Sequence, residues 1–308
     1  MDIVDLKFFE CVARVQNMNR AAGELNTVQS NVTAKIRNLE YELGVTLFNR
    51  HSRGVELTSS GSLLVPYALR IMNLVGDAKK AVSNKAYPAG PLVIGSLETI
   101  LAMHLGPSLA GYATAYPDVD VSIRTGTTRE LVELVMNYAI EGALVCGPVD
   151  HPELCASEVF TEELCVVSRR TGMRLHDLLG QPDLKEVALR VGCSYRQRLD
   201  EMLSGTDAAN RKILEFGSLE AVRATVAAGI GVAFLPRRLV EEVWSATDFT
   251  LHPVDPEFAH ASTLFVRRRD SYVSPAQTAL LDGLRTSSAA YASRKPAAAD
   301  LHIAADGR

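Results

Sequence analysis

The feature that most constrains the fold is a change of hydrophobic pattern at the proline- and glycine-rich segment 87–91. Before this segment, apolar residues recur at spacings of three and four, which is typical of amphipathic helices. After it, short apolar runs alternate with helical stretches, which is typical of a parallel sheet with helices on both faces. A chain of 308 residues is long enough for two or three domains. We therefore expect an α/β protein with an all-α N-terminal part and a hinge between the two.

Composition narrows the class of protein. Hydrophobic residues make up 47% and charged residues 22% of the chain, which is the balance of an ordinary globular protein. The net charge of -4 does not indicate a polyanionic partner. A surface that binds nucleic acid would therefore have to be a local patch of basic residues. We expect residence in the cytoplasm and no membrane contact, because neither a signal-peptide pattern nor a membrane-length apolar stretch is visible.

Residue types that bind metals or carry out catalysis are scattered along the chain. The five cysteines form no C-x-x-C pair, and the seven histidines do not cluster in the sequence. These spacings predict neither a disulfide scaffold nor a metal site. Because the sequence also contains no P-loop and no G-x-S-x-G motif, we expect neither an enzyme nor a bound cofactor.

The segment 1–58 predicts three short helices followed by a two-stranded wing. Asn19 is expected to cap the second helix and Thr27 the third, because both residue types accept hydrogen bonds from the first helical N–H groups. The third helix is expected to end at Gly44, which favours a helix C-terminus. The expected wing strands are 45–48 and 55–57.

The third predicted helix carries two different stripes. The apolar stripe consists of Val28, Val32, Ile36 and Leu39, and the polar stripe beside it of Gln29, Thr33 and Arg37. A helix of this kind can dock on its own domain with one face and enter a groove of DNA with the other. Amides pair with base edges, while Lys and Arg contact phosphates. The predicted DNA contacts are Gln29, Ser30, Thr33, Lys35 and Arg37 on the helix, and Arg50 and Arg53 on the wing.

Charge is unevenly distributed in this region. Residues 1–60 contain seven Lys or Arg and seven Asp or Glu, so their net charge is zero. Four of the seven basic residues lie between positions 35 and 53, where DNA would bind. This segregation favours DNA binding. The alternative is that the polar stripe is only a solvated helix face.

A long helix is predicted from its cap at Thr58 to about residue 85. Its apolar positions form a continuous seam of Leu63, Leu64, Tyr67, Ile71, Leu74, Val75, Ala78 and Val82. No neighbouring segment of the sequence covers the seam, so we expect it to pack against the same helix of a second subunit. The alternative is a helix that lies on its own domain.

The segment after the hinge predicts two α/β lobes. The expected strands of the first lobe are 92–95, 119–123 and 143–146, and those of the second are 164–167, 189–191, 213–216 and 232–235. A late strand at 263–266 and a final helix at 275–287 are expected to return to the first lobe. The first lobe would then comprise about 91–163 and 265–287, the second about 164–264, and residues 291–308 a flexible tail.

A resemblance to the N-terminal domain of LysR-type transcriptional regulators is carried by residues 19–61, NRAAGELNTVQSNVTAKIRNLEYELGVTLFNRHSRGVELTSSG. The matching positions are Ala21, Ala22, Gln29, Val32, Ile36, Leu39, Glu40, Leu43, Gly44, Leu47, Phe48, Arg50, Arg53, Gly54, Leu57, Thr58 and Gly61. The resemblance continues through the long helix and both lobes. Two departures are compatible with capping and bear on base preference: Ser30-Asn31 stands where many members have Pro-Ala, and Asn19 where many have Ser or Thr.

The resemblance implies a winged helix-turn-helix at 1–58, a linker and dimerisation helix with its hinge at 59–90, and an effector domain at 91–290 similar to periplasmic binding proteins. It also implies double-stranded promoter DNA and RNA polymerase as partners, and a homo-oligomer that is often a tetramer. In such proteins a small molecule between the two lobes changes how the DNA is bent.

The effector site is expected at the strand ends between the lobes. Hydroxyls and free N–H groups at helix starts suit an anion, and Arg196 would hold it bidentately. Ordinary helix capping and a surface arginine are the alternatives, and Arg198 competes with Arg196 for the role. The predicted effector contacts are Ser96, Glu98, Thr99, Thr127, Thr128, Gly147, Pro148, Ser194, Arg196, Gly217 and Ser218.

Two rival functions are consistent with the same residues. The first is a small-molecule binding protein or enzyme whose N-terminal helices serve only to oligomerise. Exposure of Gln29, Thr33 and Arg37 argues against it, since an oligomerisation helix does not need them. The second is a redox-sensing regulator that acts through Cys193, whose thiol stands near Arg196 in the sequence.

Overall fold

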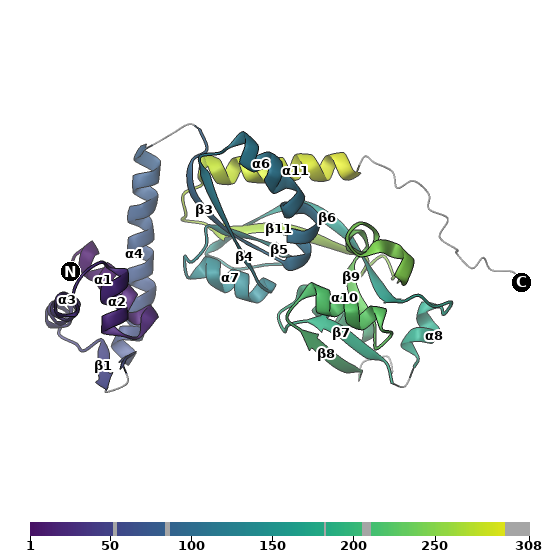
Figure 1. Cartoon of the computed structure of the whole chain (residues 1–308), viewed down its shortest axis with the longest axis horizontal. Coiled ribbons are helices and arrows are strands. Elements are labelled where there is room, and N and C mark those ends of the chain that lie inside the picture. The colour runs from purple at the N-terminus through teal and green to yellow at the C-terminus, as the bar shows by residue number, and fades with distance from the viewer. Residues whose placement is uncertain (52–53, 84–86, 182, 205–210, 293–308) are drawn as a thin grey trace, which may run out of the picture.

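The structure is a computed structural model of the chain, and it describes residues 1–51, 54–83, 87–181, 183–204 and 211–292. A small N-terminal domain sits at one end of a long helix, and an elongated α/β body lies beside that helix (Figure 1). The helix-turn-helix with its wing, the long linker helix and the two-lobed α/β body confirm the predicted architecture.

The N-terminal domain has three helices and a hairpin. They are α1 (Ile3–Val15), α2 (Met18–Glu24), α3 (Gln29–Leu43), β1 (Phe48–His51) and β2 (Gly54–Leu57). The strands of the hairpin are antiparallel. Its core is formed by apolar residues of all three helices together with the wing residues Phe48 and Val55. Burial of this shared core, rather than helix propensity, holds such short helices.

Two predicted helix caps are wrong by one or two positions. Asn17, rather than Asn19, caps α2, because its Oδ1 accepts hydrogen bonds from the N–H groups of Asn19 and Arg20. Val28 occupies the N-cap position of α3, and the Thr27 hydroxyl instead accepts a hydrogen bond from the Asn31 amide. Val28 is 64% exposed and therefore does not belong to the buried stripe.

The linker helix α4 (Ser59–Ser83) begins as predicted, with the Thr58 hydroxyl accepting the N–H of Gly61. Leu64 packs against the core of the N-terminal domain. Other seam residues remain exposed within one chain, including Leu63 at 71% and Val82 at 86%. Much of the seam is therefore not covered by the chain's own domains.

The first lobe is built on a mixed sheet. Strands β3 (Gly90–Ser96), β4 (Val119–Thr125) and β5 (Gly142–Cys146) are parallel, and β11 (His260–Arg268) pairs antiparallel to β5. The helical run is α5 (Glu98–Ile100), the π-helical turn η1 (Leu101–Leu105) and α6 (Gly106–Ala115). The helices α6 and α11 (Pro275–Ala292) lie on one side of the sheet, and α7 (Thr128–Met136) on the other (Figure 1).

The second lobe contains the parallel pair β7 (Lys185–Leu189) and β8 (Lys212–Phe216). Strands β9 (Ala233–Pro236) and β10 (Phe249–His252) pair antiparallel to the long strand β6 (Leu154–Arg169). Its helices are α8 (Leu175–Leu179), α9 (Ser194–Leu203), α10 (Leu219–Ala227), the π-helical turn η3 (Leu239–Ser245) and the short turn η4 (Ala246–Asp248).

Two features of the α/β body differ from the sequence prediction. The expected parallel sheet is mixed, because β6 and β11 run antiparallel to their neighbours over most of their length. The strand expected at 189–191 is β7, which ends at Leu189, and Val191 is exposed. This shift of two residues changes which side chains reach the space between the lobes.

Close packing of β5 against β11 predicts a sensitive position at Gly142. A Cβ at this position would lie 2.8 and 2.9 Å from Cε1 and Cε2 of the buried Phe265 ring. We expect Gly142→Ala to lower the free energy of unfolding by about 1–3 kcal/mol, as overpacking does. Adding Phe265→Leu should restore part of the loss, and urea denaturation followed by circular dichroism measures both.

Gly111→Ala is the matched control, because nothing lies within 4 Å of a Cβ added there. Its stability should equal or slightly exceed that of the wild type, since the exposed helix gains an alanine. A Gly142→Ala protein as stable as the Gly111→Ala protein would contradict this packing.

Candidate functional site

The helix α3 separates a buried stripe from an exposed face. Val32, Ile36 and Leu39 are fully buried against α1 and α2. Gln29, Ser30 and Arg37 are exposed as predicted, and Thr33 is half-buried. The exposed face also includes Asn31, Ala34 and Asn38, which the prediction did not name. Their spacing of three or four residues from the named positions is the signal that identifies them.

Lys35 is engaged within its own domain. Its Nζ lies 2.9 Å from Oδ1 of Asp5, which belongs to α1. Burial raises the pKa of Asp5, but the hydrogen bonds from Lys35 and from the N–H of Asp2 outweigh it, so the pKa is lowered overall. Lys35, which is a predicted phosphate contact, thus forms an ion pair that joins α3 to α1.

The wing is tied to α3 through Glu40. Its Oε1 accepts the N–H groups of Leu47 at 2.9 Å and Phe48 at 3.2 Å, and its Oε2 lies 3.6 Å from Arg50 Nη2. Arg50 thus stands at the edge of the domain beside the exposed face of α3. The predicted contact Arg53 lies outside the described residues.

A cleft that is open to solvent lies between the two lobes. It is lined by Leu97, Glu98, Thr99, Thr125, Gly126, Thr127, Leu189, Arg190, Cys193, Tyr195 and Gly217. Four of the predicted effector contacts are among them: Glu98, Thr99, Thr127 and Gly217. The expected position of the site between strand ends is thus matched by an actual cleft.

Three helices point their N-termini at this cleft. Thr127 caps α7 in a capping box with Glu130, Cys193 occupies the N-cap position of α9, and Ser218 caps α10. Helix N-termini carry partial positive charge and free N–H donors, so their convergence favours a negatively charged group. Arg190, at the end of β7, adds the only full positive charge among the lining side chains just described.

Side chains join the lobes across the cleft. Glu98 of the first lobe accepts the N–H of Leu219 at the start of α10, with a distance of 3.0 Å. Ser194 of the second lobe donates to Thr128 Oγ1 at 3.0 Å and lies 3.2 Å from the carbonyl of Cys146. Thr128 and Ser194 therefore hold each other instead of lining the cleft.

Behind the cleft lies a buried chain of polar groups. Tyr195 OH is 3.3 Å from Thr99 Oγ1 and 3.3 Å from Glu162 Oε2. The other carboxylate oxygen of Glu162 is 2.9 Å from Nε2 of His104. Burial, with Glu162 adding to it, raises the pKa of Tyr195 well above its ordinary value. The phenol is therefore protonated and donates its hydrogen bond to Glu162.

Arg196 does not face the cleft. Its Nη1 donates to Glu215 Oε2 on β8 at 3.1 Å, so the guanidinium is turned into the second lobe. The cation at the cleft is Arg190, whose Nη1 lies 3.7 Å from Glu130. Because β7 ends at Leu189, the arginine that reaches the cleft is Arg190, the next residue, and not Arg196 on α9.

The remaining predicted contacts have structural partners. Ser96 is fully buried and its hydroxyl donates to the Leu97 carbonyl. Gly147 forms a cis peptide bond with Pro148, and its carbonyl accepts from Arg198 at 3.5 Å. Ser218 serves as the helix cap described above. These residues surround the cleft without lining it.

Cys193 lines the cleft in a setting that suppresses its reactivity. Burial raises the pKa of its thiol above the ordinary value, although the N–H groups of Arg196 and Tyr195 act in the opposite direction. A raised pKa reduces the thiolate population, and the thiolate is the form that reacts with oxidants. This environment disfavours the redox-sensor interpretation.

Two family models match the chain. The model of the LysR substrate binding domain matches residues 85–289, and that of the bacterial regulatory helix-turn-helix protein, lysR family, matches residues 3–62. The chain belongs to the LysR family. It is a LysR-type transcriptional regulator with a helix-turn-helix domain and an effector-binding domain.

Curated relatives of this LysR-type regulator align over nearly the whole chain. The HTH-type transcriptional regulator YofA from Bacillus subtilis (strain 168) is 38% identical over 282 residues, covering 92% of this chain and 98% of the relative. The HTH-type transcriptional regulator GltR from the same organism is 36% identical over 285 residues, covering 92% and 96%.

Solved structures share the fold. A full-length OxyR variant from Pseudomonas aeruginosa has a TM-score of 0.71 at 21% identity, covering 92% of this chain and 95% of that one. Full-length CbnR in complex with its target DNA has a TM-score of 0.64 at 22% identity, covering 94% and 100%. Both likenesses concern the architecture of the chain.

The described ranges contain neither a membrane-spanning helix nor a metal-binding cluster of side chains. No helix there is both long and apolar enough to cross a membrane. Among the same residues, no group of three or more His, Cys, Asp and Glu side chains is arranged to hold a metal ion.

The Lys35–Asp5 pair predicts a pH-dependent contribution to stability. Because the pKa of Asp5 is lowered in the folded protein, its contribution is present above the ordinary value of 3.8 and is lost as the pH falls through the lowered pKa. We expect Asp5→Asn to reduce the melting temperature at neutral pH and the difference to shrink as the pH falls below 3.8.

Asp5 belongs both to the ion pair and to the capping box of α1. Lys35→Gln and the double variant distinguish the stability that comes from the ion pair from the stability that comes from the cap. If loss of the ion pair causes the destabilisation, the double variant should be no less stable than the less stable of the two single variants. A stability loss in Asp5→Asn that stays constant across the pH range would instead assign the effect to the capping box.

Proposed function

We propose that this regulator recognises promoter DNA through the exposed face of α3 and the wing. The proposed contacts are Gln29, Ser30, Thr33, Arg37 and Arg50. The observation that carries the proposal is the complete burial of Val32, Ile36 and Leu39 on the opposite face, because it fixes the rotation of α3 on its domain. Lys35 contributes indirectly, through the ion pair that holds α1 against α3.

The proposed effector is a small anion bound between the lobes. Three helix N-termini and Arg190 supply positive potential there, and the hydroxyl of Thr127 supplies a hydrogen bond. The Glu98 carboxylate already accepts the first N–H of α10, which leaves the starts of α7 and α9 for the ligand. The proposal makes Arg190, rather than Arg196, the main ionic contact.

We infer that two chains pair through the exposed seam of α4, as partly buried helices of this kind do. Assembly into a tetramer and contact with RNA polymerase are proposed from the family alone. The protein would act as a regulator without catalysis of its own, in the cytoplasm, where its promoter DNA lies.

DNA recognition is tested with Gln29→Ala and Arg37→Ala on the DNA upstream of the gene and on fragments enriched from random sequence. Gln29→Ala should lose about 1–3 kcal/mol of discrimination against random DNA, because an amide reads base edges. Arg37→Ala should weaken binding to all sequences and reduce the slope of log affinity against log salt by about one. Fluorescence anisotropy across a salt series measures both.

Lys79→Ala is the control for lost charge, since Lys79 is exposed near the C-terminal end of α4 and the N-terminal domain packs at the other end. It should bind like the wild type. If random-sequence selection enriches no site for the wild type, sequence-specific recognition fails.

The effector proposal is tested by calorimetric titration with a panel of mono- and dicarboxylates, aromatic carboxylates, sulfate and phosphate. We expect at least one of them to bind and Arg190→Ala to weaken it by about tenfold, since a charge-assisted hydrogen bond is lost. Arg196→Ala removes the same charge outside the cleft and should leave the affinity unchanged. Equal losses in both variants would contradict the assignment of Arg190.

A further inference from the structure

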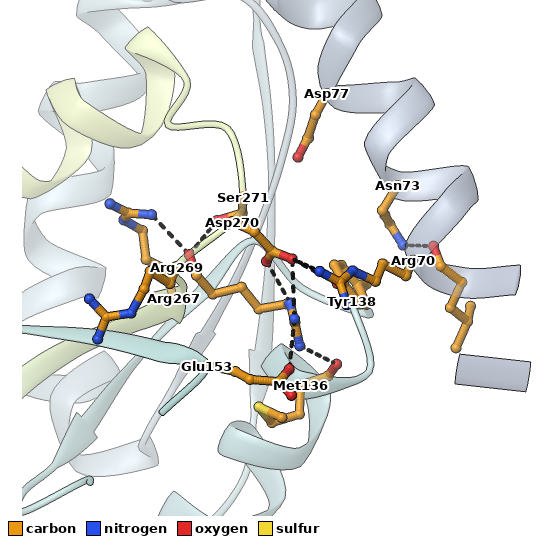
Figure 2. A network of polar contacts seen from close by, with 12 residues as sticks. Arg70, Asn73, Asp77, Met136, Tyr138, Glu153, Arg267, Arg269, Asp270 and Ser271 are labelled. Atoms are coloured by element: carbon orange, nitrogen blue, oxygen red, sulfur yellow. Dashed lines mark hydrogen bonds and ion pairs between the residues drawn. The ribbon is translucent and has the colours of Figure 1, made fainter. Parts of the chain in front are cut away.

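The linker helix meets the first lobe through a polar network that lies outside both proposed binding sites (Figure 2). Arg70 Nη2 lies 3.3 Å from Asp270 Oδ2, and the N–H of Tyr272 donates to Asp77 Oδ2 at 3.0 Å. Further along α4, Lys80 Nζ donates to Glu141 Oε1 at 2.9 Å. Arg70, Asp77 and Lys80 are seven and three residues apart, so they share one stripe of the helix.

Asp270, the partner of Arg70, is held in place by Arg268. Arg268 Nε lies 2.9 Å from Asp270 Oδ1, and its Nη2 lies 2.8 Å from Glu153 Oε2. Its guanidinium also stacks 4.2 Å from the centre of the Tyr138 ring. The hydrogen bond from Arg268 lowers the pKa of Asp270, so the carboxylate stays ionised. Arg70 therefore pairs with a charged acceptor that the first lobe itself holds in place.

The same arginine touches the end of the helix that begins at the cleft. Arg268 Nη1 donates to the carbonyl of Met136, the last residue of α7, at 3.3 Å. Thr127, the cap at the other end of α7, lines the cleft. The nine residues of α7 span about 13 Å at the rise of an α-helix. One rigid helix thus separates the cleft from the contact with α4.

We propose that Arg70, Asp77 and Lys80 are positioning residues for DNA recognition. They fix α4, and with it the N-terminal domain, on the first lobe at the far end of α7. The inference rests on the proposed DNA-binding function. Single ion pairs at a surface contribute little, but three contacts on one stiff helix restrict its position together. Glu141 and Asp270 are the corresponding docking groups on the lobe.

Amide exchange at Tyr272 reports this docking directly, because its N–H is bonded to Asp77 of α4. The Lys80–Glu141 pair is one turn away from Asp77 and is suited to charge reversal. In the full-length protein without added ligand, Lys80→Glu and Glu141→Lys should each speed exchange at Tyr272 by about two- to fivefold. The double variant, with the charges exchanged, should return the rate to that of the wild type.

Two further variants set the scale of the exchange experiment. Asp77→Ala removes the acceptor and should give the fastest exchange. Lys79→Glu makes the same charge change as Lys80→Glu on a neighbouring exposed position and should leave the rate unchanged. If exchanging the charges fails to restore protection, or if Lys79→Glu acts like Lys80→Glu, docking through this pair is wrong.

A DNA readout then separates positioning from mere packing. Nuclease protection and affinity on the selected DNA should change by about two- to fivefold in each single reversal and recover in the double variant. Faster exchange at Tyr272 with an unchanged protection pattern would overturn the positioning role. If the wild type selects no DNA site, the proposed function fails and the positioning role fails with it, while the exchange rates still decide whether α4 docks.

Discussion

The long strand β6 runs from one lobe into the other, and this shared strand fixes the relative position of the two lobes on either side of the cleft. The first part of this strand pairs with β11 and its last part with β9 and β10, so a single backbone is shared by both lobes. Glu162 lies at the passage, buried, with one oxygen on His104 and the other on Tyr195. A buried carboxylate is tolerated only when it is hydrogen-bonded, so these partners hold α9 and η1 against the strand.

The hydrogen bonds that cross the cleft are each weaker than the buried network around Glu162. The neutral hydrogen bond from Ser194 to Thr128 contributes about 1 kcal/mol net, and the charge-assisted one from Leu219 to Glu98 about 1.5–3 kcal/mol. A bound anion would add further charge-assisted hydrogen bonds at the starts of α7 and α9. Occupancy of the cleft can therefore change the balance of interlobe contacts, while the buried chain through Glu162 keeps the lobes joined. Weak contacts at the cleft and strong contacts behind it suit a domain whose lobes move when a ligand binds but do not separate.

Local sequence patterns predicted the fold class and the buried face of α3, whereas contacts between distant residues are visible only in the structure. Periodicity alone identifies Val32, Ile36 and Leu39 as buried, because a helix of this spacing has only one apolar face. It cannot reveal that Lys35 pairs with Asp5, 30 residues away, and so is not free for phosphate. Arg196, expected at the cleft, points away from it for a different reason. Strand ends are the least certain feature of a sequence pattern, and because β7 ends at Leu189, Arg190 lines the cleft.

The two proposed tasks of the linker helix fall on adjoining parts of its surface. Leu63, Leu74 and Val82 are exposed within one chain and suit a partner helix, while Arg70, Asp77 and Lys80 contact the first lobe. Leu74 is four residues from Arg70 and three from Asp77, so the exposed seam borders the contacts with the lobe. The helix has 25 residues and is about 37 Å long, with the N-terminal domain at one end. Arg268 links α7 to α4, because it contacts Met136 at the end of α7 and Asp270, the partner of Arg70. In this arrangement the contacts position the N-terminal domain, because switching it would require a second stable arrangement that a ligand favours.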